Sequence, residues 1–389
     1  MIGKYQPTFR LADLLAAAGG AEGIHATLQR QLGTMHDVRH VLLFRSAREA
    51  MQAIFRALGG TGSVVVPAYN CIAVPEAVEA AGWRPVFADV ATGDINMNCE
   101  SVAASVDSQT RAVVLTHQFG IPPDVSDVVG FCRQRGLFVV EDAAAALGAR
   151  HQGRLAGTFG DAAVLSFHFT KILNAGRGGA LLTNNGELAE RVAGLCSHPG
   201  GLLDGLTDFL AALAWWAATK PGSYAVLRRM WASLRQAQLY EVVAPRPRPQ
   251  ANGFRPCSRF VAGLVASQLK RLDVNLGKRK RLAATYAEAL TELPGVATCP
   301  VGPAADPCWM QYPVFVERKQ ECYQYMLRHG VDLSWTFRYS CGASYKASGK
   351  DNAERAARTS LGLPTYPGLR SRDARRIALL LRQFSQQIA

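Results

Sequence analysis

Between residues 41 and 185, short apolar runs alternate with helix-like stretches, and this alternation restricts the possible folds more than any other feature. Six apolar or β-branched runs are interpreted as buried strands, at 63–68, 84–90, 111–117, 137–143, 162–167 and 179–184. Helix-like stretches lie between several of them, at 48–58, 72–81 and 124–135. Strands that alternate with helices favour an α/β domain with a largely parallel central sheet. Ligands of such sheets collect outside the carboxyl ends of the strands, so the ends of these runs are candidate site positions.

The remainder of the chain is organised differently. A predicted helix at 186–197 is followed by an unusually apolar segment at 201–240 and a proline-rich linker at 244–253. A long helical pattern then covers 260–290, a strand is predicted at 310–317, and a final helix at 371–387. We therefore predict a large domain over residues 1–245, with an apolar helical insertion at 201–240. A smaller C-terminal α+β domain is predicted over residues 246–389.

The composition is that of a folded globular protein with a basic surface. Of 389 residues, 49% are hydrophobic and 19% are charged, and the formal net charge is +13. A strongly positive chain favours anionic partners, which include phosphorylated substrates, anionic lipids and nucleic acid. The basic run at 277–281 lies within the predicted helix at 260–290, where a solvated helix face explains it. We therefore predict no nucleic-acid partner.

Cysteine usage and the first residues bear on the compartment. The nine cysteines are scattered, form no CxxC pair and have no zinc-ligand spacing. Residues 1–20 lack the basic start and apolar core of a secretion signal. Reduced thiols and a cytoplasmic location are therefore expected.

Three polar residues follow the ends of predicted strands and together suggest a cofactor. Asp142 ends one run, Ser166 ends the next, and Lys171 lies just beyond it. Pyridoxal 5′-phosphate (PLP) requires an amine for a Schiff base, an acid beside its pyridine nitrogen and donors for its phosphate. Taken alone, Asp142 is equally well explained as a helix N-cap. A solvated loop lysine is the better explanation for Lys171 taken alone. His117 and His168 also lie at strand ends, either in the pocket wall or as structural histidines.

The segment 42–55 offers a second place for a phosphate. Ser46 precedes a helical pattern, so Ala47 and Arg48 provide first-turn N–H groups. Ser46 and Glu49 also match a capping box, which needs no ligand. The two interpretations are compatible.

With these residues in this order, the chain resembles the DegT/StrS-type PLP-dependent sugar aminotransferases, within the fold type I aspartate aminotransferase superfamily. The resemblance covers most of the chain and rests on the order and spacing of several motifs. These are SVVVPAYN, AAGWRPVFADV, THQFGIP, EDAAAALGA, GTFGDAAVLSFHFTK, GRGGALLTN, SQLKRLD and LGLPTYPGL. It implies a large PLP-binding domain with a mostly parallel sheet and a smaller C-terminal domain.

The resemblance also implies roles for individual residues. Lys171 would form the Schiff base, Asp142 would pair with the pyridine nitrogen, and Ser166 would bind the phosphate. Ala47 stands where the family has a glycine and would bind the phosphate through its backbone, with Arg48 beside it.

Four positions depart from the family pattern. Ala145 stands where a Gln or His usually reaches the phenolic oxygen of the cofactor, and Cys71 where an aromatic residue or His usually stacks on the ring. Arg177 replaces the acid of the family's Gly-Glu-Gly-Gly. Asn252 is close to, but out of register with, the asparagine that often crosses the dimer to the phosphate.

The function implied is an aminotransferase that moves an amino group, with glutamate as donor, to a nucleotide-linked keto-sugar. A homodimer is also implied. Two alternatives remain, namely amination of a lipid-like or polyketide-type ketone at a membrane surface, and a non-catalytic PLP-binding regulator. A lysine at position 171 argues against the family's dehydratases, in which His replaces it.

The insertion at 201–240 bears on these alternatives. Apolar residues recur at helical spacing from Leu202 to Trp216, and a second helical run after Pro221 carries arginines. The uncharged stretch 209–219 is too short to span a bilayer. Two helices of this kind fit an interfacial membrane hairpin, on the inner face of the membrane, or a hairpin packed on the body of the protein or across the dimer interface.

Overall fold

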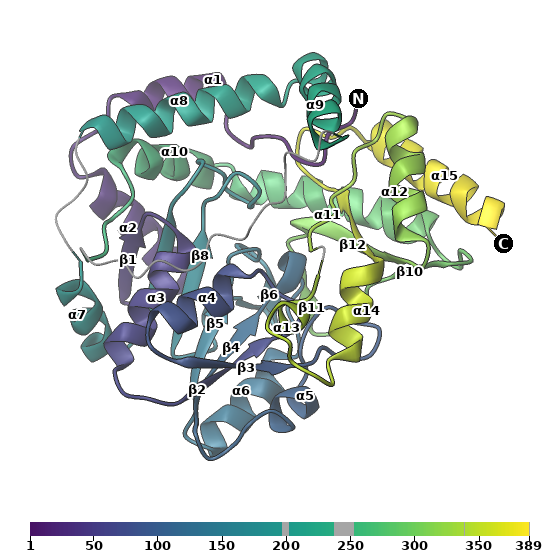
Figure 1. Ribbon diagram of the computed structural model, residues 1–389. Helices are drawn as coiled ribbons and strands as arrows, with labels where there is room; N and C mark the ends of the chain where they lie inside the picture. Colours follow the sequence, from purple (N-terminus) through teal and green to yellow (C-terminus); the bar gives the residue numbers. More distant parts are fainter. Residues whose placement is uncertain (197–201, 237–252, 338, 389) are drawn as a thin grey trace.

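The computed structural model describes residues 1–196, 202–236, 253–337 and 339–388. Its centre is a seven-stranded sheet with the order β1-β9-β8-β5-β4-β2-β3 (Figure 1). The strands are β1 (His40–Phe44), β2 (Ser63–Pro67), β3 (Arg84–Ala88), β4 (Thr110–Thr116), β5 (Phe138–Asp142), β8 (Ala162–Ser166) and β9 (Gly179–Thr183). All six predicted strand runs are confirmed, and β1 joins them at one edge.

The sheet is mostly parallel, as predicted. Strands β2, β3, β4, β5 and β8 run parallel, and β9 pairs antiparallel with both β8 and β1. The β4–β5 register places Thr116 opposite Asp142. The carboxyl ends of β4, β5 and β8 therefore share one edge of the sheet, where the site residues were expected.

Both faces of the sheet are covered, which explains the continuous apolar runs. Successive side chains of β2 point to opposite faces. Val64 and Val66 join one buried cluster together with α3 and α4, whereas Val65 joins another together with α6. The helices around the sheet are α1 (Leu11–Ala18), α2 (Ile24–His36), α3 (Ala47–Leu58), α4 (Ala73–Ala80), α5 (Cys99–Ala103), α6 (Val125–Gln134), α7 (Gly186–Gly194) and α10 (Arg259–Leu269), with a short 3-10 turn at Gln118–Gly120.

The C-terminal part forms a second buried cluster around a small antiparallel sheet. This sheet has the order β10-β12-β13, with β10 (Val296–Thr298), β12 (Gln311–Val316) and β13 (Ser360–Pro364). Its helices are α11 (Leu272–Ala289), α12 (Lys319–Arg328), α13 (Cys341–Ser344), α14 (Asp351–Thr359) and α15 (Ser371–Ile388). A third sheet joins β11 (Ala305–Asp306) to the hairpin of β6 (Arg150–His151) and β7 (Arg154–Leu155).

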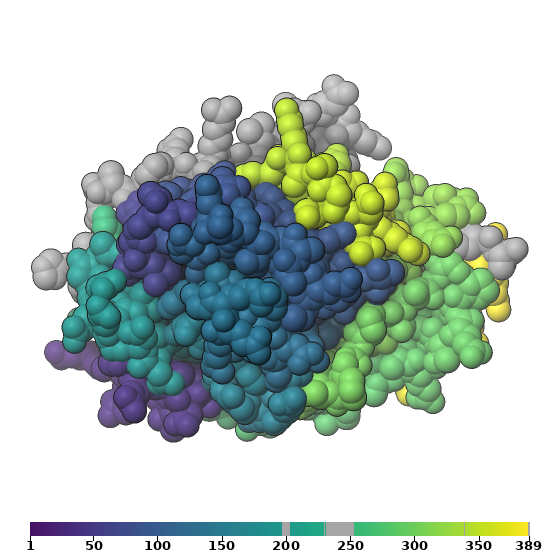
Figure 2. Space-filling model, turned by 90° about the horizontal axis from the view of Figure 1, so that it is seen from below, coloured from purple at the N-terminus to yellow at the C-terminus, as the bar shows by residue number. Residues whose placement is uncertain are grey.

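Hydrogen bonds from backbone N–H groups of the small domain connect it to the large one. Figure 2 shows the yellow-green C-terminal segment lying against the blue surface of the large domain. There the N–H of Ala353 donates to Asp89 Oδ1 at 2.8 Å, and the N–H of Cys341 donates to the carbonyl of Ala68 at 2.7 Å. The predicted domain boundary at 245/246 lies outside the described residues and stays a prediction.

The long helical pattern at 260–290 is interrupted. Helix α10 ends at Leu269 and α11 begins at Leu272, because Arg271 leaves helical geometry with φ −121° and ψ 12°. Its guanidinium pairs with Asp13 of α1 at 2.6 Å. A contact between residues so far apart in the chain had no signal in the local pattern.

The insertion forms α8 (Leu202–Ala218) and α9 (Pro221–Gln236), and this hairpin packs on the protein body. Helix α8 lies along α1 and α10, as Figure 1 shows. Within the described residues, no helix is long and apolar enough to cross a membrane.

Candidate active site

A cavity of about 1310 Å³ opens at the carboxyl edge of the central sheet. It lies between the ends of β4, β5 and β8, the N-terminus of α3 and residues 334–337 of the small domain. All eight residues predicted to form the site line this cavity, namely Ser46, Ala47, Arg48, Cys71, Asp142, Ala145, Ser166 and Lys171.

Lys171 lies in a compact loop, residues 167–178, that connects β8 to β9. The loop is closed by backbone hydrogen bonds from Phe167 to the carbonyl of Gly178 at 2.9 Å and from Ala175 to the carbonyl of Phe167 at 2.8 Å. Ile172 and Leu173 are buried directly after the lysine. Lys171 itself is half-buried in the cavity wall, so it is not a freely solvated loop lysine.

Asp142 ends β5 on the same cavity and is buried. Its Oδ1 accepts a hydrogen bond from the N–H of Ala144 at 3.1 Å, so it caps the following turn and also faces the cavity. Burial raises the pKa of the Asp142 carboxyl, while the nearby Lys171 ammonium opposes this shift. A carboxylate in such a place gains from a cationic partner, which a protonated pyridine nitrogen would provide.

Glu141 and His117 support this part of the sheet from within the protein. His117 Nε2 lies 2.9 Å from Glu141 Oε2, and both side chains are fully buried. Burial alone would raise the pKa of Glu141, but hydrogen bonds from His117 and from backbone N–H groups outweigh it and hold the pKa below its usual range. His117 is thus a structural residue, whereas His168 lines the cavity.

The N-terminus of α3 forms part of the cavity wall. The Ser46 hydroxyl accepts from the N–H of Glu49 at 3.2 Å, which confirms the N-cap. The first N–H groups of an α-helix have no partner within the helix, and Ala47 and Arg48 occupy that turn on the cavity wall.

Gly179 brings β9 against this helix terminus. A Cβ built on Gly179 would lie 2.4 Å from the backbone nitrogen of Ala47, so no larger residue fits without displacement. The loop that carries Lys171 and the turn that carries Ala47 are thereby held side by side. An amine, a buried carboxylate and a helix N-terminus around one cavity fit the three needs of PLP.

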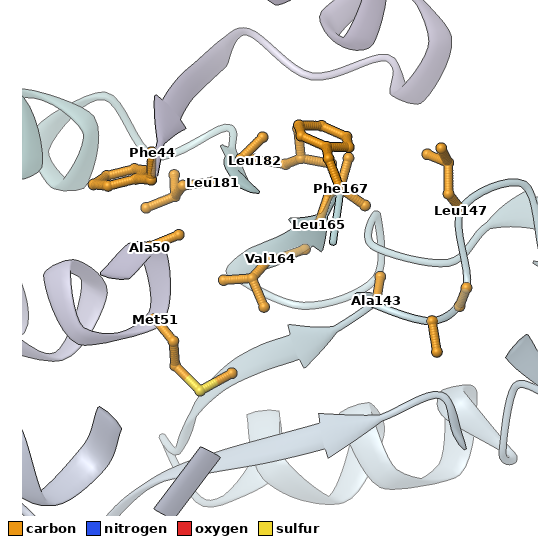
Figure 3. Close-up of a cluster of buried hydrophobic side chains, with 14 of the residues drawn as sticks. Phe44, Ala50, Met51, Ala143, Leu147, Val164, Leu165, Phe167, Leu181 and Leu182 are labelled. Carbon is orange, nitrogen blue, oxygen red and sulfur yellow. The ribbon is translucent and has the colours of Figure 1, made fainter. Parts of the chain in front are cut away.

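Figure 3 shows the buried cluster that fixes these elements relative to one another. The labelled side chains come from β1, α3, β8, β9 and the segments after β5 and β8, and are Phe44, Ala50, Met51, Ala143, Leu147, Val164, Leu165, Phe167, Leu181 and Leu182. Because these elements share one close-packed core, the site residues at their ends have fixed relative positions.

Several residues of the cavity wall had no sequence signal. Lys4 and Tyr5 come from the N-terminal segment, and Trp335 and Phe337 come from the small domain. Glu76 of α4 is buried and lies 3.2 Å from an Nη of Arg48. These side chains reach the cavity through tertiary contacts alone.

Two other wall residues could have been predicted from the sequence, because each lies just after the carboxyl end of a parallel strand. Asn70 follows β2 and donates to Thr116 Oγ1 at 2.9 Å. Gln118 follows β4 and donates to Asn70 Oδ1 at 3.1 Å. Both line the cavity beside Cys71.

The structure also shows where Ala145 and Cys71 lie, the two residues that differ from the family pattern at ring-contact positions. Both residues line the cavity, with Cys71 exposed and Ala145 buried. The methyl group of Ala145 offers no hydrogen bond to a ligand, and Cys71 presents a small thiol instead of a ring. Asn252 lies outside the described residues.

Comparison with known proteins identifies the family. The chain matches the DegT/DnrJ/EryC1/StrS aminotransferase family over residues 23–244 and 257–382. The chain belongs to this family. The resemblance inferred from the motifs is thereby confirmed, as is the prediction of an aminotransferase.

Relatives in the DegT/DnrJ/EryC1/StrS family include two transaminases of nucleotide sugars. The chain is 29% identical to a dTDP-4-dehydro-2,3,6-trideoxy-D-glucose 4-aminotransferase of Saccharopolyspora spinosa, over 82% of this chain and 77% of the relative. It is 28% identical to a dTDP-3-amino-3,4,6-trideoxy-alpha-D-glucose transaminase of Streptomyces venezuelae, over 90% of this chain and 84% of the relative.

Two solved structures confirm the fold. The aminotransferase TlmJ of Streptoalloteichus hindustanus is similar with a TM-score of 0.80 and 26% identity, over 100% of both chains. DesI, crystallised in the presence of its TDP-sugar product, is similar with a TM-score of 0.79 and 25% identity, over 100% of this chain and 93% of that chain. The predicted fold type I architecture is therefore confirmed.

Proposed function

We propose that this protein is a PLP-dependent aminotransferase that transfers an amino group from glutamate to a nucleotide-linked keto-sugar. The observation that carries the proposal is that Lys171, Asp142 and the first turn of α3 surround one cavity. Two transaminase relatives whose names specify dTDP-linked sugars support the choice of acceptor.

Bound PLP would supply a cationic ring that accepts the electron pair released at the α-carbon of the donor. Lys171 would hold the cofactor through its aldehyde carbon. Once released, its amine would move a proton between the donor's α-carbon and C4′ of the cofactor. Asp142 would keep the ring nitrogen protonated, and its burial supports a strong interaction with that cation.

The phosphate would lie at the N-terminus of α3. Ala47 and Arg48 would donate backbone N–H groups, and Ser46 and Ser166 would contribute hydroxyls from the same wall. Lys4 and the basic net charge favour an anionic acceptor. A cavity of about 1310 Å³ is above the usual range for one small ligand, which supports a cofactor together with a nucleotide sugar.

The proposal includes a homodimer in the cytoplasm. The family resemblance is the support for the dimer, and light scattering of the purified protein tests it. In the structure all nine cysteines are free thiols, which supports a reducing compartment.

Spectroscopy of the PLP-loaded protein tests the proposed activity. Glutamate should convert the absorbance of the bound cofactor to that of the pyridoxamine form, and a dTDP-linked keto-sugar should restore the first spectrum. A spectrum unchanged by glutamate and other amino acids would instead support the non-catalytic regulator.

One observation favours peripheral membrane contact as a second candidate property. The outer surfaces of α1, α8 and α9 expose large apolar side chains, namely Leu11, Leu15, Leu203, Leu206, Leu210, Val226, Leu227 and Met230. Exposed apolar helix surfaces on a basic protein are a feature of proteins that bind anionic membrane surfaces. Sedimentation with anionic vesicles tests it, and a protein that stays wholly in the supernatant contradicts it.

A further inference from the structure

The inserted hairpin contacts the loop that carries Lys171 through an ion pair. Arg177 Nε lies 2.6 Å from Oδ1 of Asp208 on α8. The Ser258 hydroxyl donates to the other oxygen of Asp208 at 2.6 Å, and Asp208 is only 3% exposed. A buried carboxylate needs such partners, so Asp208 fixes Arg177 relative to α8. Arg177 replaces an acid of the family pattern, and the insertion supplies the opposite charge.

An aromatic contact joins the same two elements. The ring of Phe169, two residues before Lys171, stacks on Trp215 of α8 with a centroid distance of 4.8 Å and an interplanar angle of 23°. On another side, a Cβ built on Gly176 would lie 3.0 Å from the Phe169 ring. The ring is therefore confined by its own loop and by α8.

The other helix of the hairpin, α9, contacts the small domain close to the wall segment 334–337. Tyr224 of α9 donates to Asp332 Oδ2 at 2.6 Å, and Arg228 donates to the same oxygen at 3.2 Å. Arg228 also donates to the Tyr323 hydroxyl at 2.9 Å. Asp332 is 1% exposed and lies two residues before Ser334, where the wall segment 334–337 begins.

We propose that the α8–α9 hairpin acts as a brace, by which we mean that it fixes the position of the Lys171 loop relative to segment 334–337 of the cavity wall. Asp208, Trp215 and Arg228 are positioning residues, since none of them lines the cavity. The catalytic meaning of this brace rests on the proposed function of Lys171. The insertion thus adds order to a loop whose lysine must approach the cofactor closely.

Hydrogen exchange of the full-length protein without added cofactor tests the brace directly. Asp208→Asn and Trp215→Leu should each raise exchange in peptides covering 167–178 by about ten-fold or more, because the ion pair with Arg177 or the stacked pair with Phe169 is lost. Arg228→Ala should do the same for peptides covering 331–337. The matched control is Trp216→Leu, the same substitution at the neighbouring tryptophan. Trp216 also packs against the buried cluster, so the control removes a similar apolar contact, and Lys220 Nζ lies 3.8 Å from its ring centroid.

A second readout separates positioning from general stability. PLP affinity, measured by titration of cofactor absorbance, should weaken about ten-fold in Asp208→Asn and Trp215→Leu, remain unchanged in Trp216→Leu, and recover in Asp208→Glu, which keeps the charge. If peptides covering 167–178 exchange no faster in Asp208→Asn and Trp215→Leu than in Trp216→Leu, the brace is overturned. A protein that binds no PLP at all contradicts the proposed function, while the exchange result still decides the brace.

Discussion

Glu141 and Asp142 are neighbours in the chain but serve the site from opposite faces of β5. Alternation along the strand turns Asp142 toward the cavity and Glu141 toward the turn at 157–160. Glu141 Oε1 accepts from the N–H groups of Phe159 and Gly160 at 2.6 and 2.7 Å, and Oε2 accepts from Gly157 at 2.8 Å. This buried carboxylate fixes the strand end on which Asp142 depends.

Glu141→Gln should therefore destabilise the protein by about 1–3 kcal/mol at pH 7, because an amide NH₂ cannot accept from a buried N–H group. The pKa of Glu141 in the folded state is lowered, so its carboxylate stabilises folding above the unfolded pKa of about 4.3. That contribution is lost as the pH falls through the folded pKa. Loss of stability in acid should therefore be shallower in the variant.

Denaturant unfolding at a series of pH values measures both effects. Glu187→Gln is the control, because the Glu187 side chain is 72% exposed. If the free energy of unfolding falls equally steeply with decreasing pH in the wild type and in Glu141→Gln, this account of Glu141 is contradicted.

At the residue scale, the sequence predicted what lies at strand ends and little else. Asp142 and Ser166 were recognisable because each ends a buried strand, and Lys171 because it lies in the loop that follows the second of these strands. Glu76, Lys4 and Trp335 were not, because each reaches the cavity from an element that is distant along the chain. The capping and phosphate interpretations of Ser46 are compatible, since its hydroxyl caps α3 at the cavity wall.

Among the elements, β9 packs closely against the N-terminus of α3, where the phosphate is proposed to bind, and so limits where that N-terminus can lie. Gly179→Ala should push the N-terminus of α3 away, since the new Cβ would meet backbone atoms of Ser46 and Ala47. We expect PLP affinity to fall about ten-fold or more, with a loss of stability of about 1–3 kcal/mol. Cofactor titration and thermal unfolding measure these two quantities.

Gly130→Ala is the matched control for this substitution. Gly130 lies within α6 and has no atoms within 4 Å of a built Cβ. An alanine there should raise stability by about 0.5–1 kcal/mol through helix propensity and leave PLP affinity unchanged. Wild-type affinity in Gly179→Ala would show that the α3 terminus does not bind the phosphate.

Elements were predictable where a local pattern determines them. The buried strands appear as apolar runs because helices cover both faces of the sheet. The interruption at Arg271 was not predictable, because Asp13, its partner, lies in α1. For the insertion, helical periodicity correctly indicated two helices, but only the contacts of Asp208 and Trp215 reveal that they pack on the Lys171 loop.

The whole molecule places the proposed chemistry between two buried clusters. The large domain supplies Lys171, Asp142 and the α3 terminus, while the small domain closes the cavity with residues 334–337. The hairpin α8–α9 contacts both parts. A site assembled in this way depends on tertiary structure for its walls, although its reactive groups follow from the order of strands along the chain.

The central claim is that Lys171 is the residue that binds PLP covalently. Reduction of the PLP-loaded protein with borohydride, followed by peptide mass spectrometry, measures this directly. We predict a phosphopyridoxyl label on Lys171, its loss in Lys171→Ala, and its retention in Lys4→Ala, since Lys4 is another lysine of the cavity wall. A label on Lys4, or no label at position 171 in the wild type, would contradict the account.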